Sequence, residues 1–129
     1  MPGSDLATSS IGQIAVVVHD VERALTFYRD RLGLPFLFQF PGLAFVRAGE
    51  VRLMLSKPEG KEHDHPGSIL YFKVAGIGAV CATLRERGVR FKDEPHLVHR
   101  APTHELWMAF FEDTEGNVLA VMEEKAVAA

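Results

Sequence analysis

The sequence is poor in cysteine, in long apolar runs and in clustered charge of one sign. Cys81 is the single cysteine of the 129 residues, so no intramolecular disulfide can form, and its helical apolar context predicts a small buried side chain. No apolar run approaches the roughly 20 residues that a membrane span needs. The 14 Lys and Arg residues are scattered among 17 acidic ones, which gives a net charge of −3 and argues against nucleic-acid binding.

The composition predicts one globular domain. With 47% hydrophobic and 24% charged residues, the chain is too apolar for intrinsic disorder. Residues 1–10 lack the positive start and apolar core of a secretory signal, so we expect a flexible leader and a cytoplasmic protein. Residues 125–129 are expected to form a loose tail, which leaves a domain at 11–124.

The first half of the domain predicts a strand, a helix and three more strands. Residues 13–18 are a β-branched run, and Asp20 stands where a helix N-cap belongs. Gly33 is placed to end the helix. After Asp20, apolar residues share one face of the expected helix, at Val21, Ala24, Leu25, Tyr28 and Leu32. Strands at 36–40, 43–48 and 51–56 are separated by Pro41-Gly42 and Gly49-Glu50.

The same pattern returns 56 residues later, after a polar, turn-rich linker at 57–66. It predicts a strand at 68–74, a helix from Ile77 that ends before Gly88, and strands at 94–99, 106–112 and 118–123. The fold class is therefore α+β, with two βαβββ modules in tandem at 11–56 and 67–124. If the two sheets pair at their edges, their uncovered faces curve round a shared cavity, which is the expected functional site.

These residues resemble the vicinal-oxygen-chelate superfamily, which includes glyoxalase I, bleomycin-resistance proteins and extradiol dioxygenases. The resemblance covers residues 11–124. It is carried by Gln13-x-x-Val16-x-Val18-x-Asp20-Val21-x-x-Ala24-x-x-Phe27-Tyr28, by Leu32-Gly33-Leu34, and by Phe110-Phe111-Glu112-Asp113-Thr114-Glu115-Gly116-Asn117. The resemblance is specific for the fold, whereas one fold hosts many chemistries.

The resemblance also implies where a divalent metal would be held. The family usually supplies His, Gln or Glu from the first and fourth strands of each module. In this chain those positions are Gln13, Met54, Ile69 and Ala120. Only Gln13 can coordinate a metal, since hard divalent ions need several oxygen or imidazole ligands. We therefore expect no metal and no cofactor.

Strand alternation predicts the residues that line the cavity. Gln13, if inward, leaves Ile14, Val16 and Val18 under the helix, and the same parity from the positions that the resemblance matches turns Arg52, Met54, Ile69, Tyr71 and Ala120 inward. The resemblance to glyoxalase I adds Phe45, Arg47, Met108 and Phe110. A guanidinium of Arg47 or Arg52 can receive a ligand carboxylate or enolate, and the alternative is an arginine at the sheet margin, in water or paired with Glu50. Trp107 has the opposite parity and is expected in the core.

No nucleophilic triad and no phosphate-binding glycine loop is readable in the sequence. His99 and Tyr71 are the acid/base candidates at the cavity, and His99 is also a candidate ligand contact. The first hypothesis is a metal-independent protein that binds a small amphipathic or aromatic molecule, as bleomycin-resistance proteins do. The alternative is a metal-dependent glyoxalase-, epimerase- or dioxygenase-type enzyme that uses histidines of the 96–104 segment. A third is a structural or regulatory domain whose side chains fill the cavity. In each case we expect a homodimer, because lone sheets leave edges to cover.

Overall fold

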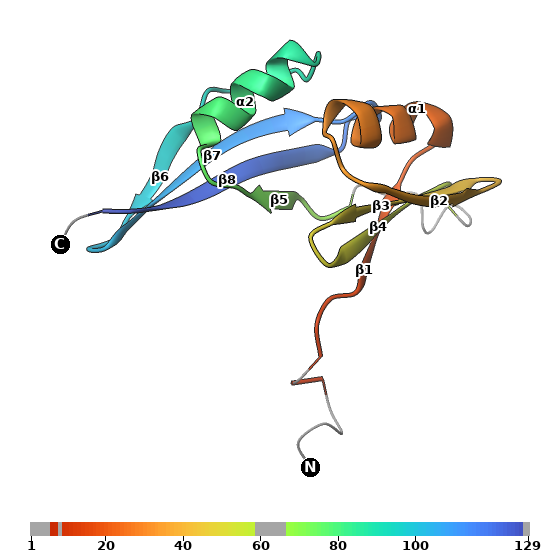
Figure 1. The fold of residues 1–129 in the computed structure, drawn as a ribbon, viewed down its shortest axis with the longest axis horizontal. Helices are drawn as coiled ribbons and strands as arrows, with labels where there is room; N and C mark the ends of the chain where they lie inside the picture. Colours follow the sequence, from red (N-terminus) through yellow and green to blue (C-terminus); the bar gives the residue numbers. More distant parts are fainter. Residues whose placement is uncertain (1–5, 8, 59–66, 128–129) are drawn as a thin grey trace.

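The computed structural model describes residues 6–7, 9–58 and 67–127, and Figure 1 shows their path. In chain order the elements are β1 (Gln13–Val17), α1 (Val21–Thr26), the π-helical turn η1 (Phe27–Arg31), β2 (Phe36–Phe40), β3 (Leu43–Ala48), β4 (Val51–Ser56), β5 (Leu70–Lys73), α2 (Ile77–Glu86), β6 (His96–Arg100), β7 (His104–Glu112) and β8 (Val118–Ala126). No helix in this part of the chain combines the length and the apolar character that a membrane crossing requires.

The strands form two four-stranded sheets with the same topology. Their orders are β1-β4-β3-β2 and β5-β8-β7-β6. In each sheet the first strand of the module runs parallel to the last, and the other pairs are antiparallel. The predicted α+β class and the tandem βαβββ order are confirmed.

Several predicted boundaries change. Strand β6 begins at His96 rather than Glu94, and β7 begins at His104, because the Ala101 N–H donates to the His104 carbonyl at 2.8 Å and closes a tight hairpin. Strand β8 continues to Ala126, which pairs with His104, so the first two residues of the expected tail lie in a strand. The expected linker at 57–66 and leader at 1–10 lie largely outside the described residues.

Each helix packs on one face of its own sheet. Figure 1 shows α1 and α2 on the same side of the two sheets. Burying this apolar face supplies most of the folding free energy. The core is filled by the alternate strand residues that point toward the helices, including Val16, Val18, Ala44, Val46, Leu53, Leu55, Ala109, Phe111, Leu119 and Val121. Trp107 packs against this core, as predicted, and its indole N–H donates to Glu105 at 3.1 Å.

The first helix does not stay α-helical to its end. It begins as predicted at Asp20, whose carboxylate accepts from the Arg23 N–H at 3.0 Å. Over η1 the backbone bond spans five residues, from the Leu32 N–H to the Phe27 carbonyl at 3.0 Å. This wider turn buries the two successive aromatic rings of Phe27 and Tyr28, which pack edge to face with centroids 5.5 Å apart.

A buried hydrogen bond joins the two modules. The Tyr28 hydroxyl donates to the Asp113 carboxylate at 2.7 Å, and Tyr28 is fully buried. Asp113 also accepts the N–H groups of Glu115 and Asn117, both at 2.8 Å, which fixes the turn before β8. Asn117 donates its side-chain amide to the Val17 carbonyl at 3.3 Å. The turn of module two is therefore fastened to the first strand and helix of module one.

The Glu115 carboxylate adds a second fastening. It accepts the Asp20 N–H at 3.0 Å, and its other oxygen lies 3.1 Å from the His19 ring nitrogen. Burial raises the pKa of this carboxyl, and the hydrogen bonds from Asp20 and His19 outweigh burial, so the pKa lies below its usual value. The contacts between the modules therefore favour the ionised form of Glu115.

Two arginines 56 residues apart make reciprocal contacts at the helix ends. The Arg31 guanidinium lies beside Gly88, where a Cβ would meet it at 3.9 Å. The Arg87 guanidinium lies beside Gly33, where a Cβ would meet it at 3.1 Å, and it donates to the Arg31 carbonyl at 3.5 Å. The internal repeat thus appears again as paired contacts between the modules.

We predict that Tyr28→Phe lowers the free energy of unfolding by roughly 1.5–3 kcal/mol, the usual contribution of a buried hydrogen bond to a charged group. Urea denaturation followed by circular dichroism measures this loss. Tyr71→Phe is the control, because Tyr71 is 45% exposed and no hydrogen bond of its hydroxyl is found in the described chain. Equal stability of Tyr28→Phe and the wild type would contradict the claim that the Tyr28–Asp113 hydrogen bond stabilises the fold.

Candidate functional site

The faces of the two sheets that α1 and α2 do not cover carry most of the predicted site residues. On the first sheet, Gln13 of β1 and Arg52 of β4 are register partners. The Arg52 Nε–H donates to the Gln13 side-chain oxygen at 2.7 Å, and the Gln13 amide nitrogen lies 3.7 Å from the Met54 sulfur. The three side chains form one connected group on this open face.

Aromatic rings border this group. The Arg52 guanidinium lies over the Phe45 ring at 5.2 Å and over the Phe38 ring at 5.9 Å from the centroids. Phe38 and Phe45 pack with centroids 4.4 Å apart, and Phe40 packs against Phe38 at 5.5 Å. Cation–π contacts of this kind hold a guanidinium in place while its outer N–H groups stay available.

The second predicted arginine has a different environment. The Arg47 guanidinium donates to the Gly49 carbonyl at 3.0 Å, within the turn between β3 and β4. The side chain is exposed and is bound to backbone rather than to Glu50. Of the two arginines, Arg52 is the one integrated into the aromatic group.

The second sheet carries a matching open face. Ala120 of β8 stands between its register partners Tyr71 of β5 and Phe110 of β7. The Tyr71 and Phe110 rings meet edge to face at 6.1 Å, and the His96 ring stacks on Phe110 at 6.5 Å. Met108 is the register partner of His96.

The histidines of the 96–104 segment lie on or near this second face. His96 and His99 pair with Met108 and Leu106, and both are exposed. A His96 ring nitrogen lies 2.9 Å from the Glu94 carbonyl, and a His104 ring nitrogen lies 2.8 Å from the Thr103 hydroxyl. No group of three metal-ligating side chains occurs among the described residues.

The structure therefore brings the predicted residues together as two groups, one on each sheet. Within the described chain no hydrogen bond or ring contact links the groups, and β1 and β5 pair only with β4 and β8. Pairing of the two sheets at their edges, the condition for a cavity shared between their open faces, is absent from this part of the chain. Both edges remain free.

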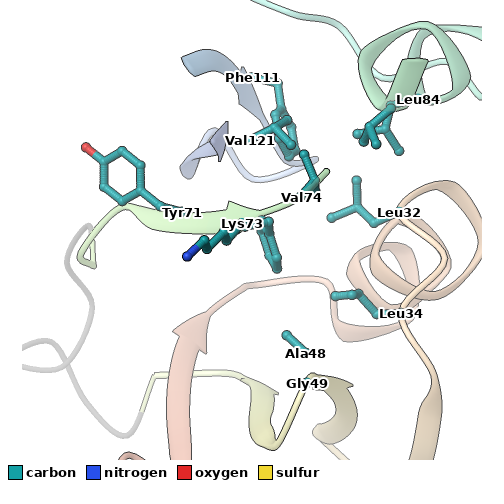
Figure 2. A pocket seen from close by; sticks show the side chains of 12 residues that line it. Leu32, Leu34, Ala48, Gly49, Tyr71, Lys73, Val74, Leu84, Phe111 and Val121 are labelled. Atoms are coloured by element: carbon teal, nitrogen blue, oxygen red, sulfur yellow. The ribbon is translucent and has the colours of Figure 1, made fainter. Parts of the chain in front are cut away.

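A cavity of about 440 Å³ lies between the modules. Figure 2 shows Leu32, Leu34 and Val74 converging on it, while the Tyr71 ring points away. Its lining is mainly apolar and comes from both modules. It comprises Leu32, Leu34, Ala48, Gly49, Tyr71, Phe72, Lys73, Val74, Val80, Leu84, Phe111 and Val121. Of the predicted site residues, only Tyr71 borders it.

The donor set at the family's metal positions does not fit a divalent cation. Met54, Ile69 and Ala120 offer no hard donor, and Ala120 is fully buried. The one amide oxygen, on Gln13, already accepts from the Arg52 guanidinium at 2.7 Å. A positive charge at that distance repels a bound cation, and Mg²⁺ or Zn²⁺ requires more than one oxygen or nitrogen ligand.

Sequence reasoning missed Phe38, Phe40 and His96. Phe38 and Phe40 pair in regular register with Phe45 and Leu43, so alternation from the predicted residue Phe45 could have found both, whereas a β-bulge changes the parity of His96 relative to His99. The register shifts between Phe36 and Phe38, so Phe36 pairs with Val46 of the core while Phe38 pairs with Phe45 of the open face. A second shift between Leu97 and His99 puts His96 and His99 on the same face. Strict alternation fails at such positions. The run Phe36, Phe38, Phe40 was the available signal.

Comparison with known proteins agrees with the fold. The model of the Glyoxalase/Bleomycin resistance protein/Dioxygenase superfamily matches residues 10–121. The solved structure of TnmS3, an antibiotic binding protein from Streptomyces sp. CB03234, is 29% identical, with 94% of this chain and 100% of that chain covered and a TM-score of 0.74.

Two further relatives carry different descriptions. Lactoylglutathione lyase from Agrobacterium tumefaciens is 26% identical, with 89% of this chain and 93% of that chain covered and a TM-score of 0.67. The Bacillus subtilis (strain 168) protein YraH is 27% identical over an alignment of 126 residues. The alignment covers 84% of this chain and 94% of that protein. With two βαβββ modules and a family match over most of its length, the chain belongs to the Glyoxalase/Bleomycin resistance protein/Dioxygenase superfamily.

Proposed function

We propose that this protein binds a small amphipathic or aromatic molecule on its open sheet faces, without a metal. The observation that carries the proposal is the Arg52–Gln13 hydrogen bond, 2.7 Å long, set among the rings of Phe38 and Phe45. It puts a cationic donor where the family places a metal ligand. The similarity to the antibiotic binding protein TnmS3 supports the same kind of function.

The open face suits a ligand that joins an aromatic body to an anionic group. Phe38 and Phe40 are 38% and 55% exposed, so flat apolar surface is available for stacking. The free N–H groups of Arg52 can receive a carboxylate or sulfonate in the bidentate manner of guanidinium groups. Gln13 keeps the guanidinium in position.

We propose further that a second copy of the chain completes the site. Both open faces carry exposed apolar side chains, among them Ile69 and Tyr71 at 41% and 45% exposure. The outer edges of β1 and β5 each present unpaired backbone groups. Pairing of these edges between two chains covers both and sets the first sheet of one copy beside the second sheet of its partner.

A cytoplasmic location stays a prediction from the sequence.

The enzymatic alternative rests on the similarity to lactoylglutathione lyase. In this chain it would have Tyr71 and His99 as acid/base groups and histidines of the 96–104 segment as metal ligands. The metal measurement below separates the two proposals.

We predict that the untagged protein, incubated with Zn²⁺, Ni²⁺, Mn²⁺ or Fe²⁺ and then desalted, retains far less than one metal ion per chain. Mass spectrometry of the elements measures the content. Near-stoichiometric metal in the wild type contradicts the metal-free proposal.

We predict that 8-anilinonaphthalene-1-sulfonate, an aromatic sulfonate, binds the wild type saturably and that Arg52→Met weakens this binding about tenfold, the loss expected for one charge-assisted hydrogen bond. Fluorescence titration gives the dissociation constant. Arg100→Met is the matched control, because Arg100 is exposed and paired with Glu105 at 3.0 Å. The proposal fails if both variants bind like the wild type.

We predict a dimer at micromolar concentration, because two free edges and two exposed apolar faces are covered together when chains pair. Size-exclusion chromatography with light scattering should give twice the mass of one chain. A mass of one chain throughout that concentration range contradicts the shared site.

A further inference from the structure

A second cavity, polar rather than apolar, lies where the end of the first helix meets the second module. Its volume is about 420 Å³, within the usual range of small-molecule sites. The lining comes from three segments that are far apart in the sequence and comprises Arg23, Phe27, Arg31, Gly88, Arg90, Phe91, Lys92, Glu112, Asp113 and Thr114. None of these residues is among the predicted site residues of the open sheet faces.

The positive charges of this cavity exceed the negative ones that can neutralise them. Lys92 is paired with Glu112 at 2.9 Å. The Asp113 carboxylate is occupied by the Tyr28 hydroxyl and by the turn that it caps. In the described part of the chain, no carboxylate lies within ion-pair distance of the remaining three cations, Arg23, Arg31 and Arg90.

Three uncompensated guanidinium groups around one concavity produce a local positive potential, although the whole chain carries a net charge of −3. Such an arrangement attracts an anion and is relieved by binding one.

One of the three arginine side chains is already held in position before a ligand binds. The Arg31 guanidinium lies beside Gly88, whose missing side chain leaves room for it, and 6.0 Å from the centroid of the Phe27 ring. Holding the group before a ligand arrives lowers the entropy cost of binding. Phe27 and Phe91 supply apolar wall beside the charges, so the cavity suits a small organic anion as well as an inorganic one.

We propose that this cavity is a second ligand site, which takes a small phosphorylated molecule by its phosphate group. A phosphate dianion has several acceptor oxygens in a compact group, and arginine forks match it bidentately. The three arginines surround a hollow rather than form an extended strip, which favours a small molecule over a nucleic-acid strand. The site shares no residue with the proposed open-face ligand site, so the two can be tested separately.

The test is isothermal titration of the full chain with pyrophosphate at low ionic strength. We expect saturable binding that weakens as salt is added, since the groups are exposed. The double variant Arg23→Gln/Arg90→Gln should bind at least tenfold more weakly. Arg29→Gln is the matched control, because Arg29 lies on the same η1 turn as Arg31 but is paired with Asp30 and lies outside the cavity. It should bind as the wild type does.

Further binding experiments distinguish the possible ligands. Glycerol phosphate should compete with pyrophosphate, whereas citrate should compete poorly, and preferential citrate binding overturns the phosphate assignment. Binding of a single-stranded oligonucleotide without any binding of pyrophosphate also overturns it. So does an equal loss in Arg29→Gln, which would show a diffuse charge effect. If thermal melting shows that the double variant is unstable, Arg90→Lys takes its place. This variant keeps the positive charge but loses the bidentate guanidinium group, and it must still bind pyrophosphate more weakly than the wild type.

Discussion

The hydrogen bond between Tyr28 and Asp113 is the contact on which the placement of the two modules depends. Burial, together with the charge and hydrogen bond of Asp113, raises the pKa of the Tyr28 hydroxyl far above its ordinary value. The hydroxyl therefore keeps its proton and remains a donor. Because the same carboxylate also organises the turn before β8, the geometry of that turn and the position of the first helix are set together.

This joint lies on the helix side and leaves the other side of both sheets uncovered. The residues that carry the family resemblance, among them Asp20, Tyr28, Asp113 and Asn117, are the ones that cap the helix or join the modules. Their roles are structural, so the resemblance identifies the fold. The proposed ligand contacts lie elsewhere, on the open face, where Gln13 and Arg52 take no part in the contacts between the modules.

The strands and their order were readable because turn signals bound them. Pro41-Gly42 and Gly49 separate strands whose ends agree with the structure, and Gly42 and Gly49 adopt the positive φ that such turns require. In β1 and β4 the face of each strand follows from alternation, which places Gln13, Arg52 and Met54 together.

What the sequence did not reveal depends on long-range or irregular geometry. The bulges in β2 and β6 change the parity of Phe36 relative to Phe38 and of His96 relative to His99. The π-helical turn buried Phe27 beside Tyr28, which a regular helical period does not predict. The arginines look scattered along the chain, and only the packing of α1 against the segment after α2 gathers Arg23, Arg31 and Arg90 around one cavity.

The central claim is that the open face of the first sheet, with Arg52 at its centre, is a ligand surface. A two-dimensional ¹H–¹⁵N NMR titration with 8-anilinonaphthalene-1-sulfonate tests it most directly. We expect the signals of the Arg52 Nε–H and the Gln13 side-chain amide to shift together as the probe saturates, while the signal of the Asn117 side-chain amide, which contacts Val17, stays unchanged. Shifts confined to helix-side residues, with Arg52 and Gln13 unchanged, would contradict it.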